Sequence, residues 1–297
     1  MELRHLEHFV VLAEELSFTR AAARLHLVQS GLSVSIRNLE KDLGAVLFER
    51  STHGVALSQS GEALLPEARR VLRDAEVARD AVAAVRGAVR GRLRIGLMQS
   101  LALLDAASLF TAFHRGHPEV VIEPRPAPGG AVSLAERVRQ GELDLAFCWL
   151  SEETAHGLRA VELATEPFVL VVPAGRRLPK GELTVRDLNG ETFVEFPEGW
   201  GARALSDRAF QDAGVRREIA VEVADTSMCA ELVRAGFGVA IMPKSHVART
   251  KGLTSRPVVG LPEWGVSLVA PAARPLTAAA AAFADLVCST FGVVLPD

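Results

Sequence analysis

The sequence predicts a mainly α-helical N-terminal domain, a long connecting helix and an α/β domain of two lobes. Three observations predict this order: helical spacing of apolar residues before residue 44, an apolar seven-residue repeat from Leu64 to Val89, and alternating strand-like and helix-like segments from Arg92 onward. A chain of 297 residues also exceeds what one hydrophobic core usually organises. We therefore expect domains at residues 1–58, 59–91 and 92–297, with lobe I at 92–163 and 266–297 and lobe II at 164–265.

The first domain begins with three short predicted helices. The first covers Leu3–Leu16, and Ser17 is a suitable N-cap for a second over Thr19–Leu25. After a turn, a third helix turns an apolar stripe inward, namely Leu32, Ile36, Leu39 and Leu43. Its outward face carries Ser30, Ser33, Val34 and Arg37. Small and polar side chains held out in this way suit a DNA major groove, although a plain helical bundle shares the same spacing.

The residues of this region strongly resemble the LysR-type transcriptional regulators. The matching runs are LRHLEHF at 3–9, SFTRAA at 17–22, QS at 29–30, LS at 32–33, IRNLE at 36–40, LG at 43–44 and LFER at 47–50. The resemblance implies a winged helix-turn-helix, with a recognition helix that starts near Ser30 and a wing after Phe48. The DNA contacts that it implies are Thr19, Gln29, Ser30, Ser33, Val34, Arg37, Arg50 and His53.

Two positions depart from the family pattern. The family usually has proline where Ser30 stands and a polar or basic side chain where Val34 stands. Val34 can touch a thymine methyl group but cannot donate a hydrogen bond, so we expect a narrower or weaker base preference.

The charge of the first domain argues mildly against DNA binding, and the motif outweighs it. The chain has a net charge of −3, and residues 1–58 hold six Lys or Arg against seven Asp or Glu. A single domain of this kind should bind DNA weakly and with strong salt dependence, whereas two or more on one DNA restore affinity.

A regular apolar seam predicts how these domains pair. It consists of Leu64, Ala68, Val71, Ala75, Ala78, Val82, Val85 and Val89, in alternating steps of four and three. This is the spacing of a coiled-coil interface, although a long helix lying on its own C-terminal domain would share it. The resemblance implies a linker helix that joins subunits into a homodimer or homotetramer.

The remainder of the chain alternates between strands and helices. We expect strands at residues 93–97, 120–123, 143–149, 168–172, 192–196, 219–223, 239–242 and 267–270. We expect helices at residues 103–113, 134–139, 202–213, 226–235 and 277–290. The resemblance implies an effector domain like a type 2 periplasmic binding protein, with two Rossmann-like lobes and crossover strands near residues 161–166 and 263–268.

Three strand-to-helix junctions carry hydrogen-bond donors that could bind an effector between the lobes: residues 99–100, 196–201 and 226–227. The candidate effector-binding residues are Gln99, Ser100, Leu101, Phe147, Phe196, Pro197, Trp200, Arg203, Thr226 and Ser227. In the family the first junction commonly holds the effector carboxylate. Alternatives stay open: Ser100 and Thr226 suit helix caps, Phe147 and Trp149 suit a core, and Arg203 suits a solvated surface.

These features predict a regulator that senses a small organic, anionic co-inducer and uses no cofactor, rather than an enzyme. We find no nucleophile-elbow, zinc-protease, P-loop or dinucleotide motif, and His5 and His8 are wrongly spaced for a helical metal site. A stand-alone solute-binding module would not need the first 90 residues.

Cysteine content leaves a second alternative, a thiol-based redox sensor of the same family that uses Cys229 near Thr226. Cys148 and Cys288 lie in apolar strings and suggest buried, reduced thiols. No signal peptide or membrane-spanning run is apparent, so we expect a bacterial cytoplasmic protein with no membrane partner. Its expected partners are operator DNA and further copies of itself, and RNA polymerase is a further candidate.

Overall fold

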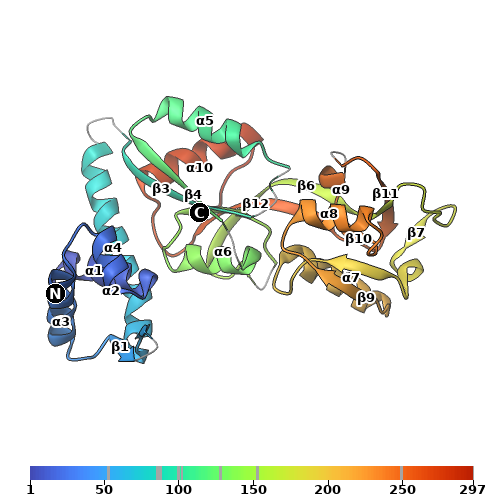
Figure 1. Cartoon of the computed structure of the whole chain (residues 1–297). Helices are drawn as coiled ribbons and strands as arrows, with labels where there is room; N and C mark the ends of the chain where they lie inside the picture. The colour runs from blue at the N-terminus through green and yellow to red at the C-terminus, as the bar shows by residue number, and fades with distance from the viewer. Residues whose placement is uncertain are drawn as a thin grey trace. The chain divides into compact units, whose positions relative to one another are not determined.

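The structure, a computed structural model, describes residues 1–51, 54–84, 89–98, 101, 103–126, 129–151, 154–247 and 250–296 (Figure 1). The chain divides into two compact units. The first comprises Met1–Ala88 with Gln140–Glu142, and the second comprises Val89–Arg139 with Leu143–Asp297.

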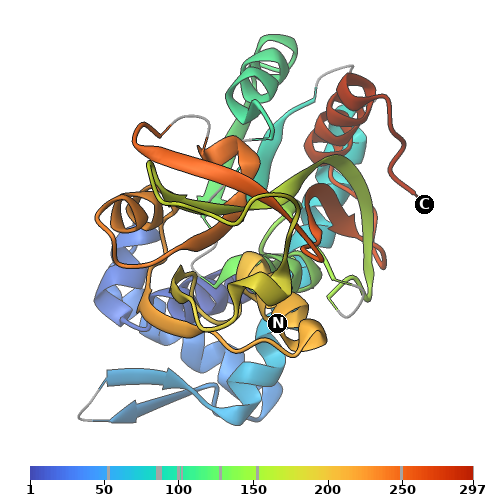
Figure 2. The same cartoon turned by 90° about the vertical axis from the view of Figure 1, so that its right-hand side faces the viewer.

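The N-terminal unit is a winged helix-turn-helix, as the sequence predicts. It contains α1 (Leu3–Glu15), α2 (Phe18–Arg24), α3 (Gln29–Leu43), β1 (Phe48–Ser51), β2 (Gly54–Leu57) and α4 (Gln59–Ala84). The side chain of Ser17 caps α2 by accepting from the N–H of Arg20. Strands β1 and β2 pair antiparallel as the wing (Figure 2). One correction concerns Leu43, which is 40 % exposed, because α3 ends there at a left-handed Gly44.

The linker helix packs against this unit along its first turns. Ala68 is buried in the same core as Phe9, Leu12 and Ile36, and Leu64 lies against that core. Helix α4 is described as far as Ala84. Val89 and Arg90 are not helical, and strand β3 begins at Gly91, so the prediction that the helix reaches residue 91 is wrong at its end. Gly91 has a φ of 104°, which no helix contains.

Lobe I of the second unit is a sheet covered by helices. Its elements are β3 (Gly91–Leu97), α5 (Ala106–Gly116), β4 (Val120–Pro126), α6 (Gly130–Arg139), β5 (Leu145–Cys148) and α10 (Ala278–Phe291). Strand β3 runs parallel to both β4 and β5. Helix α5 begins three residues later than expected, because the Asp105 side chain accepts from the N–H of Ser108 and caps it there.

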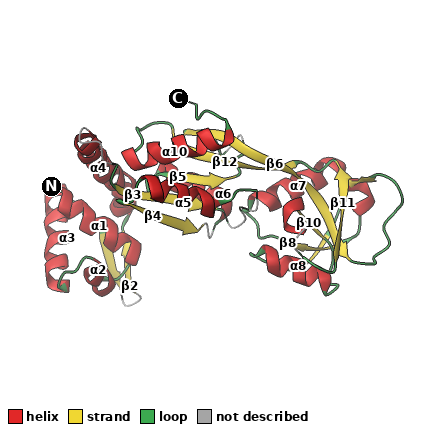
Figure 3. Cartoon of the chain, turned by 90° about the horizontal axis from the view of Figure 1, so that it is seen from above, coloured by secondary structure: helices red, strands yellow, loops and turns green. Residues whose placement is uncertain are grey.

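Two strands cross between the lobes side by side (Figure 3). Strand β6 (Leu158–Pro173) pairs with β12 (Glu263–Pro271) through Pro167 and with β10 and β11 from Phe168 onward. Both predicted crossover segments lie within these strands. The predicted strand at 168–172 is the second half of the continuous β6.

Lobe II holds the remaining elements. They are β7 (Leu183–Thr184), the 3-10 helix η1 (Val185–Leu188), β8 (Thr192–Glu195), α7 (Gly201–Ala213), β9 (Glu218–Glu222), α8 (Thr226–Arg234), β10 (Ala240–Pro243), α9 (Lys244–Val247) and β11 (Leu253–Val259). The sequence did not predict β7, η1, α9 or β11. Strands β8 and β9 run parallel, so the segments that follow both reach one end of the lobe.

Candidate functional site

Most of the predicted DNA-contacting side chains of the recognition helix α3 are exposed to solvent. Gln29, Ser30, Val34 and Arg37 are exposed, and Ser33 is half-buried. The exposed Thr19 of α2 donates its hydroxyl to Gln29 Oε1 at 3.4 Å, which joins candidate DNA contacts from two helices. Arg37 Nε donates to the Ser33 carbonyl at 3.2 Å. Arg50 lies in β1, and His53 lies outside the described residues.

Contacts from α1 hold this helix in place. Leu32, Ile36 and Leu39 are fully buried against the first two helices, and His8 Nδ1 lies 2.7 Å from Ser35 Oγ. Burial lowers the pKa of His8, which favours the neutral imidazole in this contact. The sequence reading missed Val28, which is 72 % exposed directly before α3 and adds an apolar side chain to the recognition face.

The predicted seam divides into two parts. Leu64 and Ala68 pack on the chain's own helix-turn-helix, whereas Val71, Ala78 and Val82 are exposed and Ala75 is half-buried. Val85 lies outside the described residues, and Val89 lies beyond the helix. The pairing role of the seam remains a prediction.

A pocket lies between the two lobes, and we call it the interlobe pocket. Its lining residues are Met98, Gly130, Ala131, Phe196, Trp200, Gly201, Ala202, Thr226, Pro243 and Trp264. Its volume of about 50 Å³ has room for only a few water molecules.

Three helices begin on the wall of this pocket. Gly130, Gly201 and Thr226 are the first residues of α6, α7 and α8, and all three line it. The first N–H groups of a helix have no partner within the helix, and the helix dipole is positive at that end. None of the described lining residues is charged, the start of α7 has no side-chain cap, and the Asp225 carboxylate caps α8.

Aromatic rings form the other walls. The rings of Phe196 and Trp200 are stacked, with centroids 5.8 Å apart and planes 2° apart. Trp264 stacks on Trp149 with centroids 6.4 Å apart. Gly201 lies so close to this second pair that a β-carbon there would come within 2.8 Å of Trp149 Cε3. Glycine at position 201 thus permits the close approach of α7 to the Trp149–Trp264 stack.

The pocket brings together some of the predicted effector residues. Phe196, Trp200 and Thr226 line it, whereas Phe147 is buried in the lobe I core against Phe283. Leu101 packs against the core, Pro197 is half-buried, and Ser227 is exposed. Gln99 and Ser100 lie outside the described residues. The sequence reading missed the walls formed by Met98, Gly130, Ala131, Gly201, Ala202, Pro243 and Trp264. The glycine pair before Ala131 was an available signal for a helix start.

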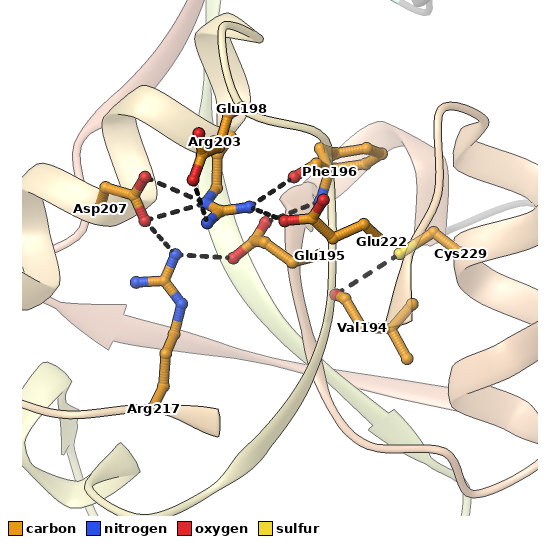
Figure 4. Close-up of polar contacts among 9 residues, drawn as sticks. All are labelled: Val194, Glu195, Phe196, Glu198, Arg203, Asp207, Arg217, Glu222 and Cys229. Carbon is orange, nitrogen blue, oxygen red and sulfur yellow. Dashed lines mark hydrogen bonds and ion pairs between the residues drawn. The ribbon is translucent and has the colours of Figure 1, made fainter. Parts of the chain in front are cut away.

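The expectation that Arg203 is a solvated surface side chain is wrong. Its side chain is 8 % exposed and lies among carboxylates (Figure 4). Arg203 Nε donates to Asp207 at 2.9 Å, and Nη1 donates to Glu222 at 2.7 Å and to the Phe196 carbonyl at 2.9 Å. Helical spacing places Arg203 four residues before Asp207, which explains the first contact.

A second buried pair adjoins the first. Arg217 Nη2 donates to Glu195 Oε2 at 3.0 Å and to Asp207, and the guanidinium lies over the Phe210 ring. Burial raises the pKa of the Glu195 carboxyl, and the charge of Arg217 opposes that shift. We call Glu195, Glu198, Arg203, Asp207, Arg217 and Glu222 the lobe II charge network.

The thiols are poorly placed for redox chemistry. Burial raises the pKa of Cys148 and of Cys229 to about 12, so neither forms a reactive thiolate near neutral pH. Cys229 Sγ donates to the Val194 carbonyl at 3.9 Å, and Cys288 is half-buried. Across the described ranges, no three His, Cys, Asp or Glu side chains gather as a metal site, and no helix could cross a membrane.

A winged helix-turn-helix joined to a two-lobed pocket domain defines a DNA-binding protein that responds to a ligand. Two family models match the chain: the bacterial regulatory helix-turn-helix protein, lysR family, over residues 3–62, and the LysR substrate binding domain over residues 86–291. The chain belongs to the LysR family of transcription regulators.

Individual relatives agree with this assignment. The chain is 38 % identical to the HTH-type transcriptional regulator ShiR of Corynebacterium glutamicum (strain R), with 81 % of this chain and 82 % of that protein covered. Its fold is similar to a full-length OxyR variant from Pseudomonas aeruginosa, with a TM-score of 0.75, 27 % identity and coverage of 97 % and 95 %. It is also similar to full-length CbnR complexed with its target DNA, with a TM-score of 0.63, 26 % identity and coverage of 98 % and 100 %.

Proposed function

We propose that this protein binds operator DNA as a homo-oligomer and senses a small organic anion, with an apolar or ring portion, in the interlobe pocket. The observation that carries the ligand class is the meeting of three helix N-termini with two aromatic walls. The helix ends favour a carboxylate, and the rings favour the apolar remainder. Ser100, which follows β3, is a further candidate donor to that carboxylate.

The proposed response is a change in the angle between the lobes. Effector binding would separate the pocket walls, and the paired linker helices would carry the change to the spacing of the recognition helices on DNA. The similarity to full-length CbnR, whose structure was solved with its target DNA, supports DNA binding by this fold. We propose a cytoplasmic site of action, contact with RNA polymerase at the promoter, and no enzymatic activity.

Calorimetry against a panel of small carboxylates tests the ligand class. Each acid is paired with its neutral amide, such as benzoate with benzamide, so that only the charge differs. We expect at least one carboxylate to bind and its amide to bind more weakly, and Ser100→Ala to weaken the carboxylate by about 2 kcal/mol if Ser100 holds it. If the acid and its amide bind with equal affinity, the proposal that the pocket selects an anion is wrong.

A thiol-based sensor is the alternative function within the family. The similarity to OxyR favours it. The raised pKa values of Cys148 and Cys229 disfavour it, because the thiolate is the reactive form. The small-anion reading therefore has the stronger support.

A further inference from the structure

The peptide backbone of Phe196 is held from both sides by charged side chains. Its N–H donates to the carboxylate of Glu195 at 3.1 Å, and its carbonyl accepts from Arg203 Nη1 at 2.9 Å (Figure 4). Hydrogen bonds to charged groups are the stronger kind. Phe196 follows the end of β8 and begins the loop that leads into α7.

The two charged groups are fixed in turn by the rest of the lobe II charge network. Arg217 binds both Glu195 and Asp207, and Asp207 also binds Arg203. Both arginines are nearly fully buried, whereas Asp207 and Glu222 are about half exposed. The network therefore extends from the surface of lobe II to the wall of the interlobe pocket.

We infer that Arg203 is a positioning residue for the aromatic wall of the interlobe pocket. Together with Glu195, Arg203 fixes the Phe196 backbone and so sets the stacking of Phe196 on Trp200. Through this stack Arg203 also sets the affinity for the effector, although Arg203 does not contact the effector. Buried ion pairs often contribute little net stability compared with apolar side chains of similar size. Glu195, Arg203 and Arg217 are the buried members of the network, and we assign them a geometric role on this ground. Only the step to effector affinity rests on the proposed function.

The chain carries its own reporter for this wall. It has three tryptophans and no tyrosine. Trp200 and Trp264 line the pocket, and Trp149 stacks on Trp264. Intrinsic fluorescence of the full-length protein therefore comes from the surroundings of the pocket alone, and it can be measured before any effector is known.

The test is the emission and acrylamide quenching of full-length Arg203→Lys. Lysine keeps the charge but cannot donate along the separate directions of Asp207, Glu222 and the Phe196 carbonyl. We expect a red shift and stronger quenching, and we expect neither when the same change is made in a Trp200→Phe background. Arg176→Lys is the matched control, because Arg176 forms a two-point ion pair with Glu191 in the same lobe, and its emission should equal that of the wild type.

The outcomes separate the inference from the proposed function. Wild-type emission and quenching in a folded Arg203→Lys protein would overturn the inference, whatever any ligand does. If that variant does not fold, Glu222→Gln, which weakens one contact of Arg203, should give a smaller red shift, and no shift would overturn it equally. Where benzoate binds the wild type, Arg203→Lys should bind it about tenfold more weakly, and equal affinity would refute the affinity step. If no carboxylate binds the wild type, the proposed ligand class fails while the fluorescence still decides the role of Arg203.

Discussion

The side chain of Asp225 accepts a hydrogen bond from the backbone N–H of Met228 at 2.6 Å, and this contact caps helix α8. From the sequence alone, Thr226 is also a candidate for this cap. Because Asp225 performs that role, Thr226 becomes the first helical residue, and it lines the interlobe pocket. The cap of α8 and the proposed ligand contact therefore belong to adjacent residues, Asp225 and Thr226, and mutation can separate them.

Thr226→Val should weaken binding of any carboxylate that binds the wild type, by about 1.5–3 kcal/mol if the hydroxyl donates to it. The thermal stability should change little, because Asp225 still caps α8. Calorimetry and thermal unfolding measure the two effects. Ser227→Ala, at the exposed neighbouring position, serves as the control and should bind like the wild type. Unchanged affinity in Thr226→Val would remove that hydroxyl from the site.

Gly201→Ala should disturb the packing of α7 against Trp149 and Trp264. The added β-carbon would lie 2.8 Å from Trp149 Cε3 and 3.4 Å from Trp264 Cζ3, so the rings or the helix must shift. Overpacking of this kind typically costs about 1–3 kcal/mol. Thermal unfolding and tryptophan emission should both change. Gly116→Ala, where nothing lies within 4 Å of the added carbon, should change neither; an unperturbed Gly201→Ala protein would refute the close approach.

Arg37→Ala should weaken operator binding by about 1–3 kcal/mol if Arg37 contacts a base. The side chain is exposed and its loss leaves the core intact, so the unfolding transition should stay in place. Gel-shift titration at moderate salt measures the effect, with Arg4→Ala, an exposed arginine on α1, as the comparison. Identical titrations for Arg37→Ala and the wild type would exclude Arg37 from the interface.

Val82→Asp should break the oligomer if the exposed part of α4 is the pairing surface. Val82 is 66 % exposed within the chain, so aspartate costs nothing in a lone subunit, whereas a seam would bury its charge unpaired. Light scattering reports the mass. Val294→Asp makes the same change at a valine that is 82 % exposed and should keep the mass of the wild type. A full-sized oligomer of Val82→Asp would contradict the seam.

Maleimide labelling of the native protein near pH 7.5 should modify Cys288 first. Cys148 and Cys229 are buried and their pKa values lie near 12, so both should react only on unfolding. Mass spectrometry of digested samples identifies the modified thiols, and labelling in denaturant gives the full signal. Rapid native labelling of Cys229 would revive the thiol-sensor alternative.

Local sequence signals predicted much of this fold, and long-range contacts decided the remainder. The Ser17 cap and the apolar stripe of α3 depend on near neighbours, so spacing revealed them. The sequence does not predict strand β11, because Pro257 lies within it and its pairing with β6 and β7 is a long-range contact. In the site, Trp200 and Thr226 could be found from strand-to-helix junctions. The contacts of Arg203 could not, since Phe196, which follows β8, and Glu222 at the end of β9 reach it only in the folded lobe.

The burial of Ala68 among the side chains of α1 and α3 has a mechanical consequence. Helix α4 packs on α1, and α1 packs on the recognition helix α3, so all three helices share one hydrophobic core. Because a close-packed core resists shear, we expect a rotation of α4 to move α3 with it. A helix of 26 residues is about 39 Å long, so a small tilt at its far end displaces the DNA-reading surface by several ångströms.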